Sequence, residues 1–251
     1  MPVAGAQDTL FCRATVAYDG TDFCGFQIQV GQRTVQGELE AALARITQTP
    51  VRVVGAGRTD SGVHAQGQVI AFRVHWNRPL AALHRGWNAV LARDVAVLSL
   101  SEADAGFHPR YSATSRTYRY TIWRHPIRMP LLRRTAHWVP QPLDVAAMAQ
   151  AARSLLGEHD FATFGRPPQG TNTVRRVIRS AWTGKGDVLY FEITANAFLY
   201  RMVRSIVGTL LRVGRGALST DEFAIRLASA RRSMAGPTAP ANGLCLMAVH
   251  Y

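Results

Sequence analysis

The sequence predicts an α+β protein made of two ferredoxin-like (split βαβ) halves, with mixed or antiparallel sheets flanking a central cleft. Three observations predict this fold. Strand and helix periodicities alternate along 10–100 in the order β-α-β-β-α-β. A variant of that order recurs over 114–249, and the 251 residues are enough for two domains of about 125 each. We therefore expect one domain over 1–105 and a second over 106–251, with no low-complexity linker between them.

Each element of the first half has a local reason in the sequence. We expect its strands at 10–18, 51–54, 68–74 and 94–100, and apolar side chains alternate along 10–18 and 68–74. Thr34 is typical of a helix N-cap, and Pro79 is typical of a helix start. The two helices that follow carry apolar stripes at helical spacing, formed by Val35, Leu39, Leu43 and Ile46 and by Leu80, Leu83, Trp87, Val90 and Leu91.

The second half follows the same plan with additions. We expect strands at 114–123, 135–139, 173–182, 187–194 and 244–249, and helices at 143–156, 198–213 and 220–229. Alternation along 187–194 directs Leu189, Phe191 and Ile193 toward the core. The helix at 198–213 carries an apolar stripe that begins at Leu199.

The net positive charge of the chain comes entirely from its second half. The net charge is +13, and Lys185 is the only lysine among 29 cationic residues. Residues 1–105 hold nine arginines and nine acids, whereas 106–251 hold 20 cations and seven acids. The positive electrostatic field of such a surface favours binding of a polyanion, because each contact with a phosphate releases counterions. Arginine also suits forked phosphate contacts and stacking on bases. The charge therefore predicts a nucleic-acid partner, in preference to a membrane surface, since no basic amphipathic helix with an aromatic face is present.

Composition excludes several other classes of protein. A hydrophobic fraction of 47% with 18% charged residues is typical of a globular chain. No apolar run is long enough to span a membrane, and residues 1–8 lack the pattern of a signal peptide. Cys12, Cys24 and Cys245 form no CxxC pair, so we expect reduced thiols in a cytoplasmic protein and neither zinc nor a disulfide framework.

The densest motif is the loop from Gly55 to Ala65, which reads GAGRTDSGVHA. Asp60 stands where a dinucleotide-binding fingerprint needs its third glycine, no GK[ST] follows, and a strand comes next. The loop is therefore not expected to hold a nucleotide phosphate. Asp60 has two interpretations. It is an ordinary turn aspartate, or it is a nucleophile, because a carboxylate is ionised at neutral pH and needs no base to activate it.

This loop resembles the catalytic loop of the TruA family of tRNA pseudouridine synthases, and further matches follow in the family's order. Residues 18–29 resemble its N-terminal signature, and 107–113 resemble its tRNA-contacting segment. Segments 116–120 and 195–208 resemble those that carry its active-site tyrosine and arginine. With the closing strand over 243–251, the resemblance spans nearly the whole chain.

The resemblance implies isomerisation of uridine to pseudouridine at positions 38, 39 and 40 of the tRNA anticodon stem-loop. It implies a homodimer without metal or organic cofactor, and a catalytic cleft between the halves. Asp60 matches the nucleophile, Tyr118 the residue that stacks on the target base, and Arg204 the partner that holds the aspartate. Besides Tyr118, the implied substrate contacts are Arg58, Arg78, Phe107, His108, Arg110, Tyr111 and Leu246. The proline-rich stretch 165–172 departs from the family's second RNA-contact loop.

Other interpretations compete with these roles. By itself, Tyr118 is typical of a sheet-face aromatic, and Arg204 of a surface arginine on an apolar helix. Asp19 beside Gly20 is typical of a turn. A non-catalytic RNA-binding module of the RRM type would need an RNP1 string, which is absent. A nucleotide-dependent dehydrogenase or ATPase is disfavoured by the glycine spacing of the loop around Asp60.

Overall fold

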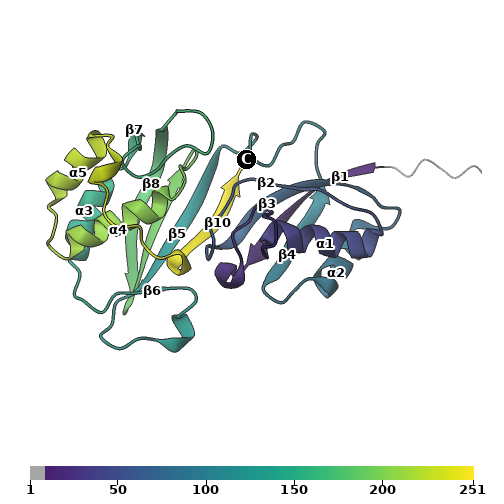
Figure 1. The fold of residues 1–251 in the computed structure, drawn as a ribbon, viewed down its shortest axis with the longest axis horizontal. Coiled ribbons are helices and arrows are strands. Elements are labelled where there is room, and N and C mark those ends of the chain that lie inside the picture. The colour runs from purple at the N-terminus through teal and green to yellow at the C-terminus, as the bar shows by residue number, and fades with distance from the viewer. Residues whose placement is uncertain (1–8) are drawn as a thin grey trace, which may run out of the picture. The chain divides into compact units, whose positions relative to one another are not determined.

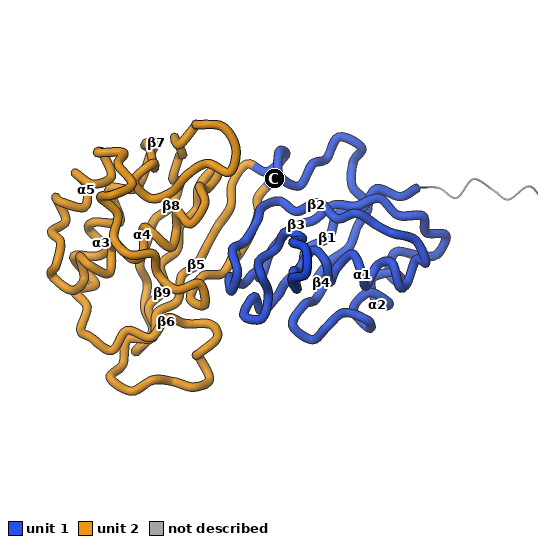
Figure 2. Tube along the Cα trace, in the orientation of Figure 1, with its two compact units in different colours: residues 1–113, 251 blue, residues 114–250 orange. Residues whose placement is uncertain are grey.

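The computed structural model describes residues 9–251, which form two compact units (Figure 2). Of the described residues, unit 1 comprises 9–113 together with Tyr251, and unit 2 comprises 114–250. The segment 106–113 thus belongs to unit 1, whereas the sequence-based boundary lies at 105/106. Its attachment has a clear cause, because Phe107 packs on the ring of Tyr251 and under the guanidinium of Arg13.

Unit 1 has the predicted β-α-β-β-α-β order. Its elements are β1 (Thr9–Tyr18), α1 (Val35–Thr47), β2 (Val53–Gly55), β3 (His64–His75), α2 (Leu80–Val90) and β4 (Val95–Glu102). The strands lie in the order β4-β1-β3-β2, and every neighbouring pair is antiparallel. This is the ferredoxin-like arrangement that the sequence predicts.

The capping and packing signals of unit 1 act as expected. The Thr34 hydroxyl accepts a hydrogen bond from the Gly37 N–H at the start of α1, and Gln48 ends the helix in a left-handed conformation. The centre of each apolar stripe is buried, at Val35, Leu39 and Leu43 of α1 and at Leu83 and Trp87 of α2. Trp87 meets Phe72 of β3 edge-to-face at 5.2 Å. Helix and sheet therefore share one core.

Unit 2 is a ferredoxin-like variant. Its strands are β5 (Ser115–Trp123), β6 (His137–Trp138), β7 (Gly157–Asp160), β8 (Val174–Lys185), β9 (Val188–Ala195) and β10 (Leu244–His250). Its helices are α3 (Val145–Arg153), α4 (Met202–Gly214) and α5 (Thr220–Ala228). The sheet order is β10-β5-β9-β8-β7, with β6 parallel to β5 at its end. The sequence does not predict the short edge strand β7 beside β8, because four residues are too few to show an alternation of apolar and polar side chains.

The helices of unit 2 group together beside their sheet (Figure 1). The sheet residues Tyr120, Phe191 and Ile193 are fully buried, and so is the apolar stripe of α4. Helix α4 begins at Met202 and not at 198, because Arg201 adopts a left-handed conformation with φ of 60°. The residues just before it form a turn, in which the Met202 N–H donates to the Leu199 carbonyl.

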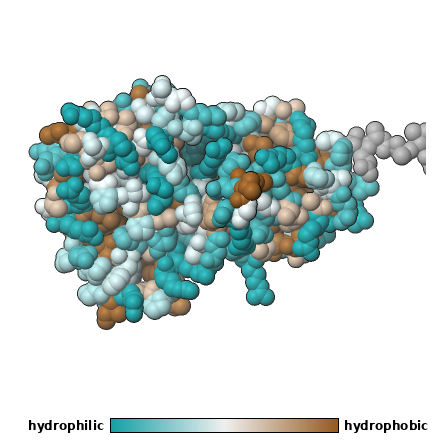
Figure 3. Space-filling view, in the orientation of Figure 1, coloured by the Kyte–Doolittle hydropathy of each residue, from teal (hydrophilic) through white to brown (hydrophobic). Residues whose placement is uncertain are grey.

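The face of the protein seen in Figure 3 is mainly polar, with scattered apolar patches. Among residues 9–251, no helix has the length and apolar character that crossing a membrane requires.

Candidate active-site and RNA-contact residues

Asp60 lies in a tight turn between β2 and β3. The Val63 N–H donates to the Asp60 carbonyl at 3.1 Å, and Gly62 supplies the positive φ of 77° that the turn needs. Thr59, just before it, is buried, whereas Asp60 itself is half-buried. The turn therefore anchors its backbone in unit 1 and brings the carboxylate to the boundary of the core.

The segment that follows β1 holds this turn in place. The Tyr18 phenol and the Thr59 hydroxyl are hydrogen-bonded at 2.8 Å, and the Phe26 N–H donates to the Thr59 carbonyl. On the other side of Asp60, the Ser61 hydroxyl and the Gly62 N–H both donate to the Phe23 carbonyl. Because bonds flank Asp60 on both sides, its backbone is fixed before any substrate binds.

Glycines allow this close contact between the two segments. Gly25 has a φ of +85°, and a Cβ there would lie 2.7 Å from the Thr59 carbonyl oxygen and 3.3 Å from the Asp60 carbonyl carbon. A Cβ at Gly20 would lie 2.0 Å from the Val63 carbonyl oxygen. The N-terminal signature is therefore a scaffold for the Asp60 turn, a role that its sequence alone does not reveal.

Two ionisable residues beside the turn have structural roles. Asp19 accepts a hydrogen bond from the Thr21 N–H, which caps a short 3-10 helix. The buried His64 accepts a hydrogen bond from the Gly20 N–H at its Nδ1, 3.2 Å from a carboxylate oxygen of Asp19. Both contacts tie the start of β3 to the end of β1, in agreement with Asp19 as a turn residue.

Two of the predicted RNA contacts in unit 1 are exposed arginines. The Arg58 Nε donates to the Gln27 side-chain oxygen at 3.1 Å, which orients the guanidinium next to the Asp60 turn. Arg78 lies immediately before Pro79 at the N-terminus of α2. Both side chains are accessible to a polyanion.

The segment 107–111 presents an aromatic ring beside a cation. Tyr111 is 74% exposed, its ring lies 4.3 Å from that of His108, and the Arg110 guanidinium lies 5.7 Å from its centroid. The His108 Nδ1 accepts hydrogen bonds from the backbone N–H groups of Arg110 and Tyr111. The turn is thus fixed by its own histidine, and an exposed aromatic beside an arginine suits a nucleobase next to a phosphate.

A brace behind this segment holds it against unit 1. The Tyr251 phenol donates to the Pro109 carbonyl at 2.8 Å, and its ring lies 5.0 Å from that of Phe107. The Arg13 guanidinium lies within 5.6 Å of both ring centroids. Phe107 therefore serves the packing of the segment, and Tyr111 and Arg110 carry its exposed chemistry.

In unit 2, Tyr118 lies on β5 opposite Ile193 of β9 and Leu246 of β10. It shares a face with the buried Tyr120 but is itself only half-buried, and Phe198 meets its ring edge-to-face at 5.0 Å. Leu246 is 1% exposed. Tyr118 is therefore the partly accessible aromatic at the margin of a core to which Leu246 belongs.

Arg204 lies in the first turn of α4, and it is tied to the segment before β10. Its Nε donates to the Ala239 carbonyl at 2.8 Å, and the Ala239 N–H donates to the Arg204 carbonyl at 3.0 Å. Burial raises the pKa of Tyr120 well above its usual range, and the positive charge of Arg204 opposes that rise. Arg204 is thus a half-buried, positioned guanidinium on the side of β5 from which Tyr120 projects.

Sequence reasoning missed a further cationic cluster in unit 2. The guanidinium groups of Arg166 and Arg201 lie 5.3 and 4.9 Å from the ring centroid of Tyr200, which is 40% exposed. A Cβ at Gly165 would lie 2.6 Å from the Leu199 Cβ, so the glycine permits this approach. An isolated bridge between Arg166 and Tyr200 also joins the two segments, and no local pattern predicts it.

No group of histidine, cysteine or acidic side chains suited to a metal ion occurs among residues 9–251. The candidate residues divide between the units, with Asp60, Arg58, Arg78 and the 107–111 segment in unit 1, and Tyr118, Arg204 and Leu246 in unit 2.

Comparisons with known proteins give one consistent result. A family model described as tRNA pseudouridine synthase matches residues 14–112 and 151–251. A tRNA pseudouridine synthase A of Chloroflexus aurantiacus is 48% identical over 244 residues, which cover 94% of this chain and 87% of the relative. Its counterpart in Geobacillus kaustophilus is 44% identical over 245 residues, with 95% and 93% covered. The solved Nop10–Cbf5 complex of an archaeal box H/ACA sRNP aligns at a TM-score of 0.38 and 13% identity over 80% of this chain and 44% of that chain, too low to carry a conclusion.

Proposed function

This chain belongs to the tRNA pseudouridine synthase family, and from that premise we propose that it isomerises uridine to pseudouridine at positions 38, 39 and 40 of the tRNA anticodon stem-loop. The observation that carries the proposal is the Asp60 turn, in which hydrogen bonds on both sides hold the backbone of one half-buried aspartate. This scaffold favours Asp60 as the nucleophile.

The reaction needs three changes at one nucleotide. The N-glycosidic bond breaks, the uracil turns, and its C5 bonds to the sugar. A carboxylate can act by attack on C1′ of the sugar, by attack on C6 of the base, or by helping to remove the C2′ proton. In each route the Asp60 carboxylate must lie at a fixed distance from the ring, which a rigid turn provides.

Two residues of unit 2, Tyr118 and Arg204, complete the proposed site. A base inside a helix must be extruded, at a cost of a few kcal/mol. Stacking on Tyr118 offsets about 1–3 kcal/mol of that cost. The Arg204 guanidinium, positioned by Ala239, compensates the charge of Asp60 in a site from which the substrate excludes water.

The RNA-binding surface combines exposed arginines with exposed aromatic rings. We assign Arg58, Arg78, His108, Arg110 and Tyr111 to RNA contact, because they are exposed or half-buried and carry the chemistry of phosphate and base recognition. Phe107 and Leu246 support their neighbours from behind. No cofactor is assigned to the reaction. We place the enzyme in the cytoplasm as a homodimer, where its three free thiols stay reduced.

The test is release of tritium from C5-labelled uridine in an unmodified tRNA transcript, followed by mapping of the pseudouridines formed. The proposal expects stoichiometric release and products confined to positions 38, 39 and 40. Tight tRNA binding without tritium release would show an RNA-binding module in place of an enzyme. Products at other positions would overturn the assigned substrate region.

A further inference from the structure

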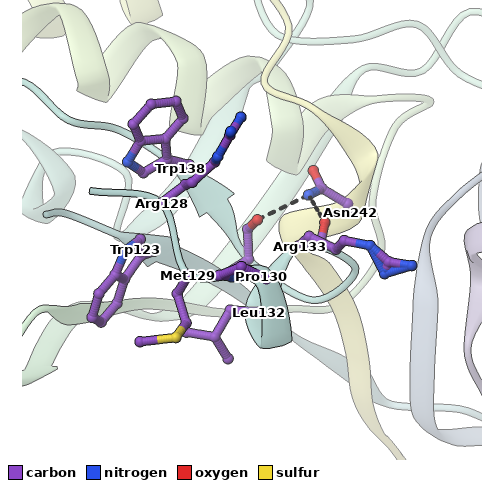
Figure 4. Close-up of a pocket in the computed structure, with 9 residues that line it drawn as sticks. Trp123, Arg128, Met129, Pro130, Leu132, Arg133, Trp138 and Asn242 are labelled. Carbon is purple, nitrogen blue, oxygen red and sulfur yellow. Dashed lines mark hydrogen bonds between the residues drawn. The ribbon is translucent and has the colours of Figure 1, made fainter. Parts of the chain in front are cut away.

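Unit 2 contains a depression of about 530 Å³ that none of the candidate active-site residues lines (Figure 4). It lies at the loop that joins β5 to β6. Two tryptophans, two arginines and two apolar side chains form most of it, namely Trp123, Trp138, Arg128, Arg133, Met129 and Leu132. Figure 4 shows these side chains arising from the loop and the adjoining strands.

Both tryptophans have their indole N–H groups occupied by backbone carbonyls. The Trp123 Nε1 donates to the Ile127 carbonyl at 2.9 Å, and the Trp138 Nε1 donates to the His125 carbonyl at 2.8 Å. These bonds fix the orientation of each ring. Trp138 nevertheless remains 42% exposed. An oriented and accessible indole is a ready surface for stacking.

The side chain of Asn242 holds the loop in place. The Asn242 side-chain amide, from the segment before β10, donates to the Arg133 carbonyl at 3.0 Å and to the Ala136 carbonyl at 2.8 Å (Figure 4). The depression is therefore preformed, so a ligand does not have to order the loop on binding.

The loop between β5 and β6 carries positive charges and no negative ones. No acidic residue occurs between Asp104 and Asp144, while Arg124, Arg128, Arg133 and Arg134 fall within the loop. Arg128 and Arg133 are exposed, and within the described part of the chain neither forms an ion pair. Two cations without acidic partners favour an anionic ligand.

We propose that this depression binds one unstacked nucleotide of RNA, with its base against Trp138 and its phosphates at Arg128 and Arg133. The inference rests on the proposed function, since that supplies RNA as the substrate. Single-stranded bases are recognised by aromatic rings and arginine planes, and Met129 and Leu132 add apolar side chains to the lining. A second copy of the chain fits less well, because a two-fold interface on this surface would bring the arginines of both loops together, with no acidic residue in 105–143 to pair with them.

The test measures the affinity for an unmodified tRNA transcript across a series of salt concentrations. We expect Trp138→Leu to weaken binding about tenfold, from the loss of one stacked base. Arg128→Gln and Arg133→Gln should each reduce the slope of log affinity against log salt by about 0.7–0.9. Arg153→Gln is the matched control, because Arg153 is an exposed arginine at the end of α3, and it should leave affinity unchanged.

Tryptophan fluorescence gives a second, direct readout. Stacking of a base on Trp138 should quench part of the emission when tRNA binds, and Trp138→Phe should remove that part of the signal. Wild-type affinity and salt slope in Trp138→Leu, Arg128→Gln and Arg133→Gln alike would overturn the proposal. So would a change of particle mass in the variants without any change in RNA affinity, which would identify a contact between copies of the chain. Both measurements report binding and not catalysis. If the protein binds tRNA at the depression but forms no pseudouridine, the proposed function is refuted while the binding proposal stands.

Discussion

The scaffold of the Asp60 turn predicts a large effect for a single methyl group at Gly25. In Gly25→Ala the new Cβ would lie 2.7 Å from the Thr59 carbonyl oxygen. An ordinary C···O contact is about 3.3 Å, so the turn must move by about 0.6 Å. A displacement of this size at a catalytic carboxylate should lower the rate of chemistry at least about tenfold, because about 1 Å can cost 10²-fold. The tRNA affinity should change much less.

Gly31→Ala is the matched control. Gly31 also has a positive φ, +71°, but a Cβ there meets no atom within 4 Å. Both variants carry the cost of a side chain in the left-handed region, about 1–2 kcal/mol. Only Gly25→Ala displaces Asp60.

The assay is tritium release at saturating tRNA, with thermal unfolding of both variants. We expect a normal rate for Gly31→Ala and a strongly reduced rate for Gly25→Ala at temperatures where both are folded. Equal rates in the two variants would refute the idea that contact with Gly25 fixes Asp60.

Three further predictions concern other parts of the molecule. Tyr118→Phe keeps the ring but removes the hydroxyl, so a reduced rate in single-turnover assays would assign the hydroxyl to proton movement, and an unchanged rate confines Tyr118 to stacking. Arg110→Glu should weaken tRNA binding and flatten its salt dependence, and an unaltered slope would remove Arg110 from the phosphate contacts. Glu222→Gln tests the cap of α5. The Ser219 backbone N–H lowers the pKa of Glu222, so its stabilising effect is present above the usual range of a glutamate and is lost as pH falls through the lowered pKa. The variant should therefore be less stable than wild type near pH 7, and denaturation at successively lower pH should show the difference vanishing.

Local periodicity was sufficient to predict most elements of both units. Strand β1 alternates between buried and more exposed residues along most of its length, and Thr34 caps α1 as its residue type suggests. The start of α4 was placed four residues too early, because Leu199 extends the apolar stripe although Arg201 breaks the helix backbone. The spacing of apolar side chains gives no information on the left-handed φ angle of one residue, here Arg201.

The sequence predicts the motifs of the candidate site, but it does not predict the hydrogen bonds that hold the Asp60 turn in place. The sequence shows the loop around Asp60, yet its hydrogen bonds to Tyr18, Phe23 and Phe26 join residues more than 30 positions apart. Periodicity carries no information on such contacts. The Tyr200 cluster was invisible for the same reason, because its cations come from two separate segments.

The most direct test of the account is the single-turnover rate of Asp60→Asn at saturating tRNA, with the tRNA affinity measured in the same preparation. Asparagine preserves the size of the side chain and removes its charge. The account predicts a loss of at least about 10⁴-fold in pseudouridine formation, as for removal of a nucleophile, with affinity close to wild type. Pseudouridine formed at a rate near that of wild type would contradict it, because the carboxylate would then have no part in the chemistry.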